Sequence, residues 1–267
     1  MDDNDHGTHV SGTIAGKGND GKGVAGVNWT GSILPVKFLN GGGSGTLVDA
    51  VKAIQYVNKM GAHMSNNSWG GGGFTQSMFD AIKEANDKGI LFIAAAGNDG
   101  QDADSRPHYP AGYQVANVIA VAATTNLDTL ANFSTYGKRT VHIAAPGHEI
   151  YSTIAGGGYD TFSGTSMATP HVAGAAALLW GTDTSMSGAT VKDRLLRSRD
   201  YIGTLSRKVA SSGRLNVFNA LTGNYPPSPE PAESDWRDMS LPAPIESAHP
   251  YADRTTQTWT IEGPANA

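Results

Sequence analysis

The chain has 267 residues, of which 39% are hydrophobic and 16% charged, and it carries a formal net charge of −5 at pH 7. This is the composition of an ordinary soluble globular protein, and the negative charge disfavours a nucleic-acid partner. The sequence contains no cysteine, which excludes disulfides and thiol catalysis. Its longest uncharged apolar run, Val172 to Trp180, is too short to insert across a bilayer.

Strand-like and helix-like segments alternate from Gly7 to about Gly223. Apolar residues recur every three to four positions over Leu47–Met60 and, less strongly, over Met78–Ala85, which predicts two amphipathic helices. Apolar runs of strand length occupy four segments: Ile33–Leu39, Ile90–Ala96, Val118–Ala123 and Val141–Ala145. Because near-continuous apolar strands belong to sheets that are covered on both faces, the pattern predicts an α/β fold, a doubly wound and mostly parallel sheet with helices on both faces.

The composition changes after Gly223. Seven of the 13 prolines lie between Pro226 and Pro250, which predicts a proline-rich linker over residues 224–250. Residues 251–267 contain a single strand-like stretch, and one strand cannot fold alone. After a main domain over residues 1–223, we interpret this end either as the start of a truncated β-rich accessory domain or as a disordered tail.

Candidate reactive groups lie in three glycine-framed stretches, His6–Val10, Ala94–Asn98 and Gly164–Pro170. Pro170 fits only near the start of a helix, so a helix is predicted to begin between residues 165 and 167. Ser166 then has backbone N–H groups and the positive end of the helix dipole beside it, which suits a nucleophile whose attack creates an oxyanion. A serine needs a neighbouring base, for which His6 is the candidate, and Asn98 can donate its amide to the same oxyanion.

Each of these residues also has a structural interpretation. Ser166 alone would suit a helix N-cap, and residues 98–100 would suit a simple turn. His6 and His9 would suit a partial metal site, but the sequence has no His-Glu-x-x-His pattern and no third ligand at a telling spacing. The residues by themselves favour a serine hydrolase, for which we expect no organic cofactor.

Together the stretches HGTHVSGTIAG (6–16), AAAGNDG (94–100) and GTSMATPHVAG (164–174) resemble the histidine, oxyanion and serine motifs of the subtilisin family of serine endopeptidases. The resemblance implies that His6 is the general base and Ser166 the nucleophile, which forms an acyl-enzyme with a polypeptide substrate. It also implies that Asn98 and the Ser166 N–H form the oxyanion hole. His9 is structural in the family.

The resemblance extends to segments that hold the substrate. Gly43-Ser44-Gly45 and Ser68-Trp69-Gly70 match two strands that grip an extended peptide between them, by β-augmentation. Gly70 and Ala96-Gly97 match walls of the primary specificity pocket, and Asp99 at its rim suggests a preference for basic residues before the cut. Tyr109-Pro110 resembles a proline corner near this pocket and is a candidate cis bond.

Gly18–Val24 resembles a calcium loop of the family. Calcium binds several oxygens, and here Asp20 offers a carboxylate, with backbone carbonyls of Gly18, Lys22 and Val24 beside it. We therefore expect a structural Ca²⁺ site with Asp20 as a ligand. The alternative is a solvated glycine turn.

In the family, an aspartate on its own strand precedes the catalytic histidine, and only Met1–Asp5 precede His6 here. We therefore expect an N-terminally incomplete domain that lacks this strand, a fragment that has little or no activity and folds poorly alone. Asp5 is expected to cap the helix that His6 opens and not to replace the missing acid. The resemblance further implies a secreted parent protein made with a pro-segment. An inactive peptide-binding scaffold, and an esterase or transferase, are the alternative functions.

Overall fold

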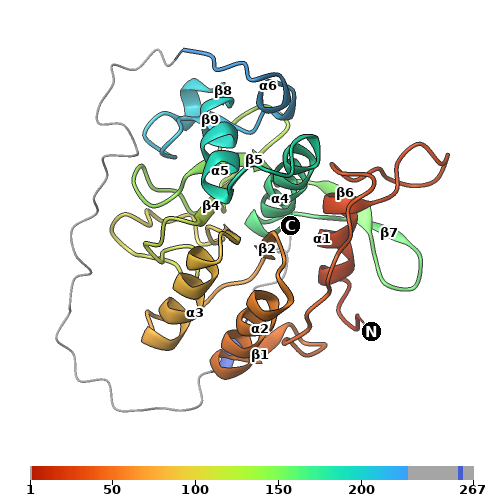
Figure 1. The fold of residues 1–267 in the computed structure, drawn as a ribbon, viewed down its shortest axis with the longest axis vertical. Helices are drawn as coiled ribbons and strands as arrows, with labels where there is room; N and C mark the ends of the chain where they lie inside the picture. The colour runs from red at the N-terminus through yellow and green to blue at the C-terminus, as the bar shows by residue number, and fades with distance from the viewer. Residues whose placement is uncertain (1, 228–257, 261–267) are drawn as a thin grey trace.

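The computed structural model describes residues 2–227 and 258–260 (Figure 1). Its centre is a six-stranded sheet in the order β2-β3-β4-β5-β9-β8. The strands are β2 (Met64–Asn67), β3 (Leu91–Ala95), β4 (Val118–Thr124), β5 (Ile143–Pro146), β9 (Gly213–Arg214) and β8 (Asp200–Tyr201). All neighbouring pairs run parallel except β8 and β9. The predicted doubly wound, mostly parallel sheet is therefore confirmed.

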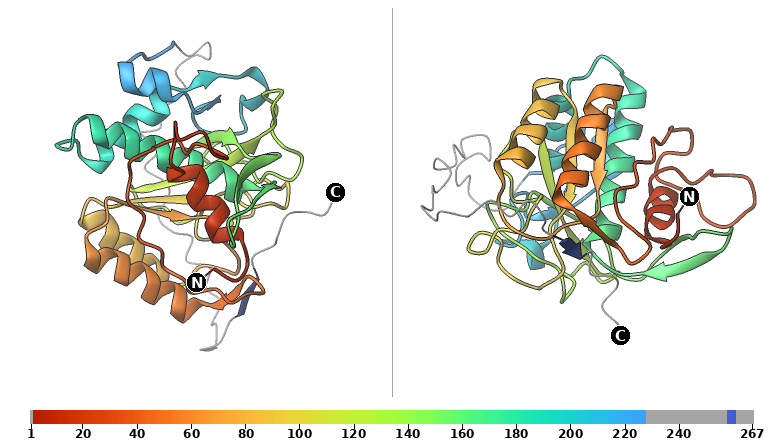
Figure 2. Two further views of the ribbon diagram at one scale, coloured as in Figure 1. Left: turned by 90° about the vertical axis from the view of Figure 1, so that its right-hand side faces the viewer. Right: turned by 90° about the horizontal axis from the view of Figure 1, so that it is seen from below.

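Helices cover both faces of this sheet (Figures 1 and 2). They are α1 (His6–Ala15), α2 (Leu47–Met60), α3 (Gln76–Asp87), α4 (Thr165–Thr182), α5 (Gly188–Arg197) and α6 (Val217–Thr222), with a 3₁₀ turn at Gly203–Leu205. Two further antiparallel strand pairs complete the fold. β6 (Ile150–Thr153) pairs with β7 (Tyr159–Phe162), and β1 (Ser44–Thr46) pairs antiparallel with β10 (Thr258–Thr260). Within the described residues, no helix is long and apolar enough to cross a membrane.

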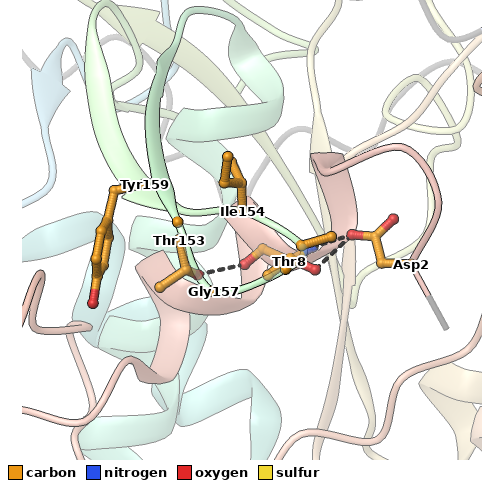
Figure 3. A pocket seen from close by; sticks show the side chains of 9 residues that line it. Asp2, Thr8, Thr153, Ile154, Gly157 and Tyr159 are labelled. Carbon is orange, nitrogen blue, oxygen red and sulfur yellow. Dashed lines mark hydrogen bonds between the residues drawn. The ribbon is translucent and has the colours of Figure 1, made fainter.

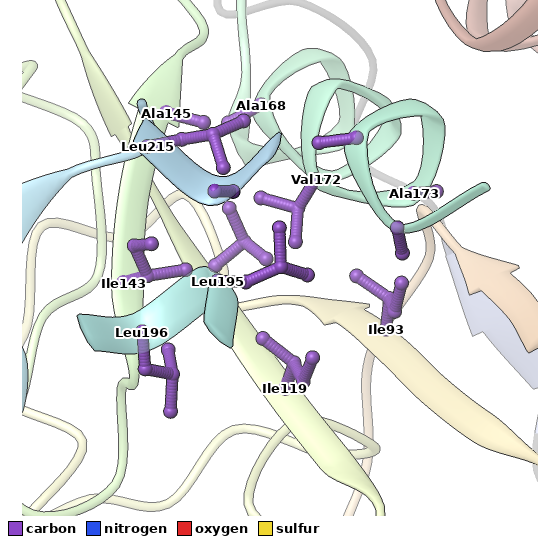
Figure 4. Close-up of a cluster of buried hydrophobic side chains, with 14 of the residues drawn as sticks. Ile93, Ile119, Ile143, Ala145, Ala168, Val172, Ala173, Leu195, Leu196 and Leu215 are labelled. Carbon is purple, nitrogen blue, oxygen red and sulfur yellow. The ribbon is translucent and has the colours of Figure 1, made fainter. Parts of the chain in front are cut away.

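Alternate residues of the central strands supply two separate cores, because successive side chains of a strand point to opposite faces. Ile93, Ile119 and Ile143 face α4 and α5 in the first core, where Val172 and Leu195 pack on them (Figure 4). The intervening residues face α2 and α3 in the second core, among them Phe92 and Ala94. This double burial explains why β3 and β4 are continuously apolar.

The helix boundaries follow local rules. α2 spans the predicted Leu47–Met60, and the Thr46 hydroxyl accepts a hydrogen bond from the Asp49 N–H at its start. α4 begins at Thr165, inside the predicted window, but Pro170 lies inside the helix and beyond its first turn, so the rule used to place the start does not hold here. The Tyr109–Pro110 bond is cis, as expected from the resemblance.

The prediction of a strand at Ile33–Leu39 is wrong. These residues are extended but pair with no strand in the described part of the chain, and Ile33 and Leu34 are 40% and 43% exposed. An apolar run becomes a strand only when a neighbour completes its hydrogen-bond ladder. Most of the predicted linker and of the predicted accessory-domain start (residues 228–257 and 261–267) lies outside the described residues.

Candidate functional site

His6 and Ser166 lie in the first turns of α1 and α4. These two helices pack directly against each other (Figure 1). The carbonyl oxygen of Ile14 lies 3.1 Å from the position that a Cβ on Gly174 would take, so the end of α1 lies close to the middle of α4.

Ser166 is the second residue of α4 and is 7% exposed. Its hydroxyl donates a hydrogen bond to the Ser68 carbonyl (3.1 Å), and the Ser68 hydroxyl donates to the Ser166 carbonyl (2.8 Å). This reciprocal pair ties the segment after β2 to the start of α4. In this arrangement the hydroxyl of Ser166 is directed at a backbone oxygen and not at His6.

Asn98 is oriented by Thr165. Its Oδ1 accepts hydrogen bonds from the Thr165 N–H (2.8 Å) and hydroxyl (2.9 Å), so its Nδ2 faces elsewhere. A Cβ on Gly164 would lie 3.5 Å from that Nδ2 and 3.7 Å from the Ser166 nitrogen. Nδ2 of Asn98 and the backbone nitrogen of Ser166 therefore both lie close to Gly164, where the missing side chain leaves room. Such a pair can stabilise an oxyanion.

His6 opens α1, and its Nε2 is buried with no hydrogen-bond partner in the described part of the chain. Burial lowers the pKa of the imidazole to about 4, with a smaller contribution from His9 and an opposing one from the carboxylate of Asp2. The side chain is therefore neutral at pH 7. A neutral imidazole with a free Nε2 can accept a proton.

The acids around His6 are engaged elsewhere. The expectation that Asp5 caps α1 through its side chain is wrong, because its Oδ1 accepts from the Ala155 N–H (2.9 Å). Asp2 fills that role instead, accepting from the N–H (2.8 Å) and the hydroxyl (2.6 Å) of Thr8. Among the described residues, no carboxylate hydrogen-bonds the imidazole of His6.

Comparison with known proteins identifies the family of the chain. The chain matches the Subtilase family over residues 1–221. The chain belongs to the subtilase family. It is 42% identical over 225 residues to the Thermophilic serine proteinase of Bacillus sp. (strain AK1), which covers 83% of this chain and 53% of that protein. It is 40% identical over 218 residues to Thermitase of Thermoactinomyces vulgaris, covering 82% and 75%.

Solved structures agree with this subtilase assignment. The crystal structure of a cold adapted subtilisin-like serine proteinase superposes with a TM-score of 0.69 at 34% identity, covering 81% of this chain and 74% of that one. The fold is therefore subtilisin-like. The chain spans about half the length of the Bacillus relative and three quarters of Thermitase.

The predicted substrate-binding segments of this subtilase lie on three neighbouring loops. Gly43 precedes β1, and Ser44 and Gly45 are its first residues. Ser68, Trp69 and Gly70 follow β2, where Trp69 packs edge-on against Phe38. Ala96 and Gly97 follow β3 and are buried, whereas Asp99 is exposed. The β1 backbone accepts an antiparallel strand, because β10 pairs with it.

The hollow beside α1 is separate from the predicted catalytic residues of this subtilase. A pocket of about 470 Å³ lies between the first turn of α1 and the turn that joins β6 to β7, with Asp2, Thr8 and Tyr159 in its wall (Figure 3). Neither His6, Asn98 nor Ser166 lines it. The chemistry predicted from the sequence therefore does not belong to this pocket.

Asp20 lies in an exposed turn of the subtilase chain. Its Oδ1 accepts from the Lys22 N–H (3.0 Å), and residues 17–25 line a hollow of about 270 Å³. No group of three or more histidine, aspartate or glutamate residues with a metal-binding arrangement occurs in the described residues. One carboxylate falls short of the six to eight oxygens that calcium takes, so these residues alone do not fit a calcium ion.

Two residues of the subtilase site escaped the sequence analysis. Thr165 orients Asn98, and its position before the serine could have suggested this, since an oxyanion donor needs a fixed amide. His108 lies between Gly70 and Gly97, where a Cβ on either glycine would collide with its ring. No local pattern in the sequence signals that contact.

Proposed function

We propose that this subtilase is a serine endopeptidase that cleaves extended polypeptides through an acyl-enzyme at Ser166. The observation that carries the proposal is the pair of donors, Asn98 Nδ2 and the Ser166 N–H, which both lie close to Gly164. A structural serine at a helix start needs no such arrangement. An oxyanion that forms on attack by Ser166 does.

In this mechanism the Ser166 oxygen forms a bond to the scissile carbonyl carbon while its proton passes to Nε2 of His6. The carbonyl oxygen becomes an oxyanion that accepts hydrogen bonds from Asn98 and the Ser166 N–H. The tetrahedral intermediate then collapses, and His6 returns the proton to the leaving amine. Water repeats the sequence on the acyl-enzyme and releases the second product, with His6 again as base.

The substrate is proposed to lie as an extended strand along Ser44–Thr46 and Ser68–Gly70. The pairing of β10 with β1 supports this, since it uses the backbone groups that β-augmentation requires. Ser68 tethers its own segment to Ser166 by the reciprocal hydrogen bonds, which keeps the peptide-binding strand in register with the nucleophile.

The inactive scaffold is the second candidate, and two observations favour it: the Ser166 hydroxyl is bonded to the Ser68 carbonyl, and no described carboxylate hydrogen-bonds His6. The test uses the full product of the gene, with peptide hydrolysis and mass-spectrometric labelling of Ser166 by a fluorophosphonate as readouts. Hydrolysis and labelling that are both lost in Ser166→Ala and His6→Ala support the peptidase. Peptide binding without either signal supports the scaffold, and turnover of esters alone supports an esterase.

Three further properties belong to the proposal. A structural calcium ion would need oxygens beyond those of residues 17–25, and calorimetry with the full gene product tests for it. Secretion with a pro-segment is supported by the family resemblance, and it is tested by finding a processed form in the culture medium. The sequence of the gene upstream of Met1, in frame, tests for a strand that ends in aspartate.

A further inference from the structure

The imidazole of His108 occupies the space between the two glycine walls of the predicted primary pocket. A Cβ on Gly70 would lie 2.2 Å from Nε2 of His108, and a Cβ on Gly97 would lie 2.9 Å from its Cγ and 3.0 Å from its Nδ1. One ring therefore contacts a wall on each side. Glycine residues in a pocket wall leave space for a substrate side chain, but here the imidazole of His108 fills the space between Gly70 and Gly97.

The backbone around this ring is held from both sides. The Gly71 N–H donates to the Tyr109 carbonyl (2.9 Å), which links the segment of His108 to the Gly70 wall. The Gly112 N–H donates to the His108 carbonyl (2.7 Å), and Tyr109 packs on Tyr113 with ring centroids 4.6 Å apart. These bonds fix the backbone that carries His108, and its half-buried ring lies between the two glycine segments.

Asp99 is already engaged on the same side of the pocket. Its Oδ1 accepts from the Thr135 hydroxyl and from the Gln101 N–H. Burial acts to raise the pKa of Asp99, but these hydrogen bonds and the charge of His108 lower it overall. Both donors bind Oδ1, and they hold the carboxylate of Asp99 at the exposed side of His108.

We propose that His108 closes the inner end of the primary specificity pocket, so that this subtilase cleaves after small uncharged side chains such as alanine and serine. The inference rests on the proposed peptidase function and names its substrate class. A phenylalanine or leucine side chain would have to displace the ring, and overpacking a fixed site costs about 1–3 kcal/mol. That cost corresponds to roughly tenfold to a hundredfold in kcat/KM.

The experiment measures kcat/KM of the full gene product on peptides that differ only in the residue before the cut: alanine, phenylalanine, lysine or glutamate. The wild type is expected to prefer alanine over phenylalanine by about tenfold or more. His108→Gly is expected to raise phenylalanine cleavage by a similar factor while alanine cleavage changes little. His108→Gln keeps the bulk of the ring without its charge and should keep the alanine preference.

His63→Ala is the matched control, since His63 is an exposed histidine that packs on Trp180 near the far end of α4. It should leave every ratio unchanged. A wild-type preference for phenylalanine or lysine, or an unchanged phenylalanine-to-alanine ratio in His108→Gly, overturns the proposal. Should His108→Gly fail to fold, His108→Ala gives the same comparison.

A failure of the peptidase function itself would look different, because no peptide would be cleaved and Ser166 would not be labelled. The pocket is then measured without turnover, from the NMR signals of the His108 ring on titration with peptides that end in alanine or phenylalanine. Tighter binding of the alanine peptide, with a shift of the ring signals, supports the role of His108. Equal or tighter binding of the phenylalanine peptide refutes it.

Discussion

We predict that His6 in the chain of residues 1–267 titrates near pH 4, below the ordinary 6.5 of histidine. Burial of the ring is the main cause, His9 adds to it, and the carboxylate of Asp2 opposes it. Nε2 is buried without a partner in the described part of the chain, so no hydrogen bond compensates the charged form. The pKa of His6 therefore measures whether its surroundings in this chain stabilise the protonated form that a general base must reach.

The difference between 6.5 and about 4 corresponds to about 3 kcal/mol against the imidazolium. The attack on a peptide bond creates that imidazolium, so a chain in which nothing offsets this cost loses roughly two orders of magnitude in the proton-transfer step. The unfolded chain binds the proton more tightly between pH 4 and 6.5. The free energy of unfolding therefore falls as the pH is lowered through this window.

Two measurements check the value. NMR titration of the His6 ring gives its pKa directly. Urea unfolding at pH 7 and pH 4 compares the wild type with His6→Gln, which should lose up to about 3 kcal/mol less stability between the two pH values. Buried histidines other than His9, which interacts with His6, titrate equally in both proteins and cancel. A His6 pKa at or above 6.5 would refute the reasoning, because it would require a carboxylate on the ring that the described contacts do not provide.

Three further predictions follow from buried polar groups and from β10. Thr165→Val removes one of the two donors to Asn98 Oδ1 and should lower kcat about tenfold with little change in KM; steady-state kinetics with an equal kcat would contradict this. Lys192 donates to the Ala116 and Val118 carbonyls, and burial lowers its pKa to about 8, so the free energy of unfolding should rise from pH 8 to 10.5 in the wild type. Urea unfolding should show that Lys192→Met lacks this rise, and parallel pH curves would disprove it. In the full gene product, deletion of Thr258–Thr260 removes β10 and should speed peptide hydrolysis, because the edge of β1 becomes free. Equal or slower rates would show that β10 does not compete with substrate.

Local rules were enough to predict most of the framework. β3 and β4 are buried on both faces, so their residues are apolar up to Ala123 and the pattern was clear. The apolar periodicity gave the bounds of α2, and α4 begins inside the predicted window although Pro170 lies beyond its first turn. The same logic failed at Ile33–Leu39, since an apolar run states a preference for burial but does not contain the neighbouring strand that would pair with it.

Sequence motifs were enough to predict which residues are reactive, but they did not predict which residues these contact. Ser68 and Ser166 are 98 residues apart and exchange hydrogen bonds, and His108 is 38 residues from the Gly70 wall that it contacts. Contacts of this kind are set by how β2, β3 and α4 pack together, and no short pattern encodes them. The cap of α1 is a smaller case: Asp2 and Asp5 are equally suitable by type, and the backbone geometry selected Asp2.

The site divides into two halves that are supported to different degrees. The proposed oxyanion half is held by partly buried hydrogen bonds, because Thr165 donates twice to Asn98. The proposed proton-transfer half has no such support, since Nε2 of His6 has no partner among the described residues and the Ser166 hydroxyl is bonded to Ser68. Electrostatic stabilisation of the oxyanion does not depend on the protonation of His6. A chain with only the first half should still bind and polarise a peptide carbonyl, so peptide binding alone cannot distinguish the peptidase from the scaffold, whereas covalent labelling of Ser166 can.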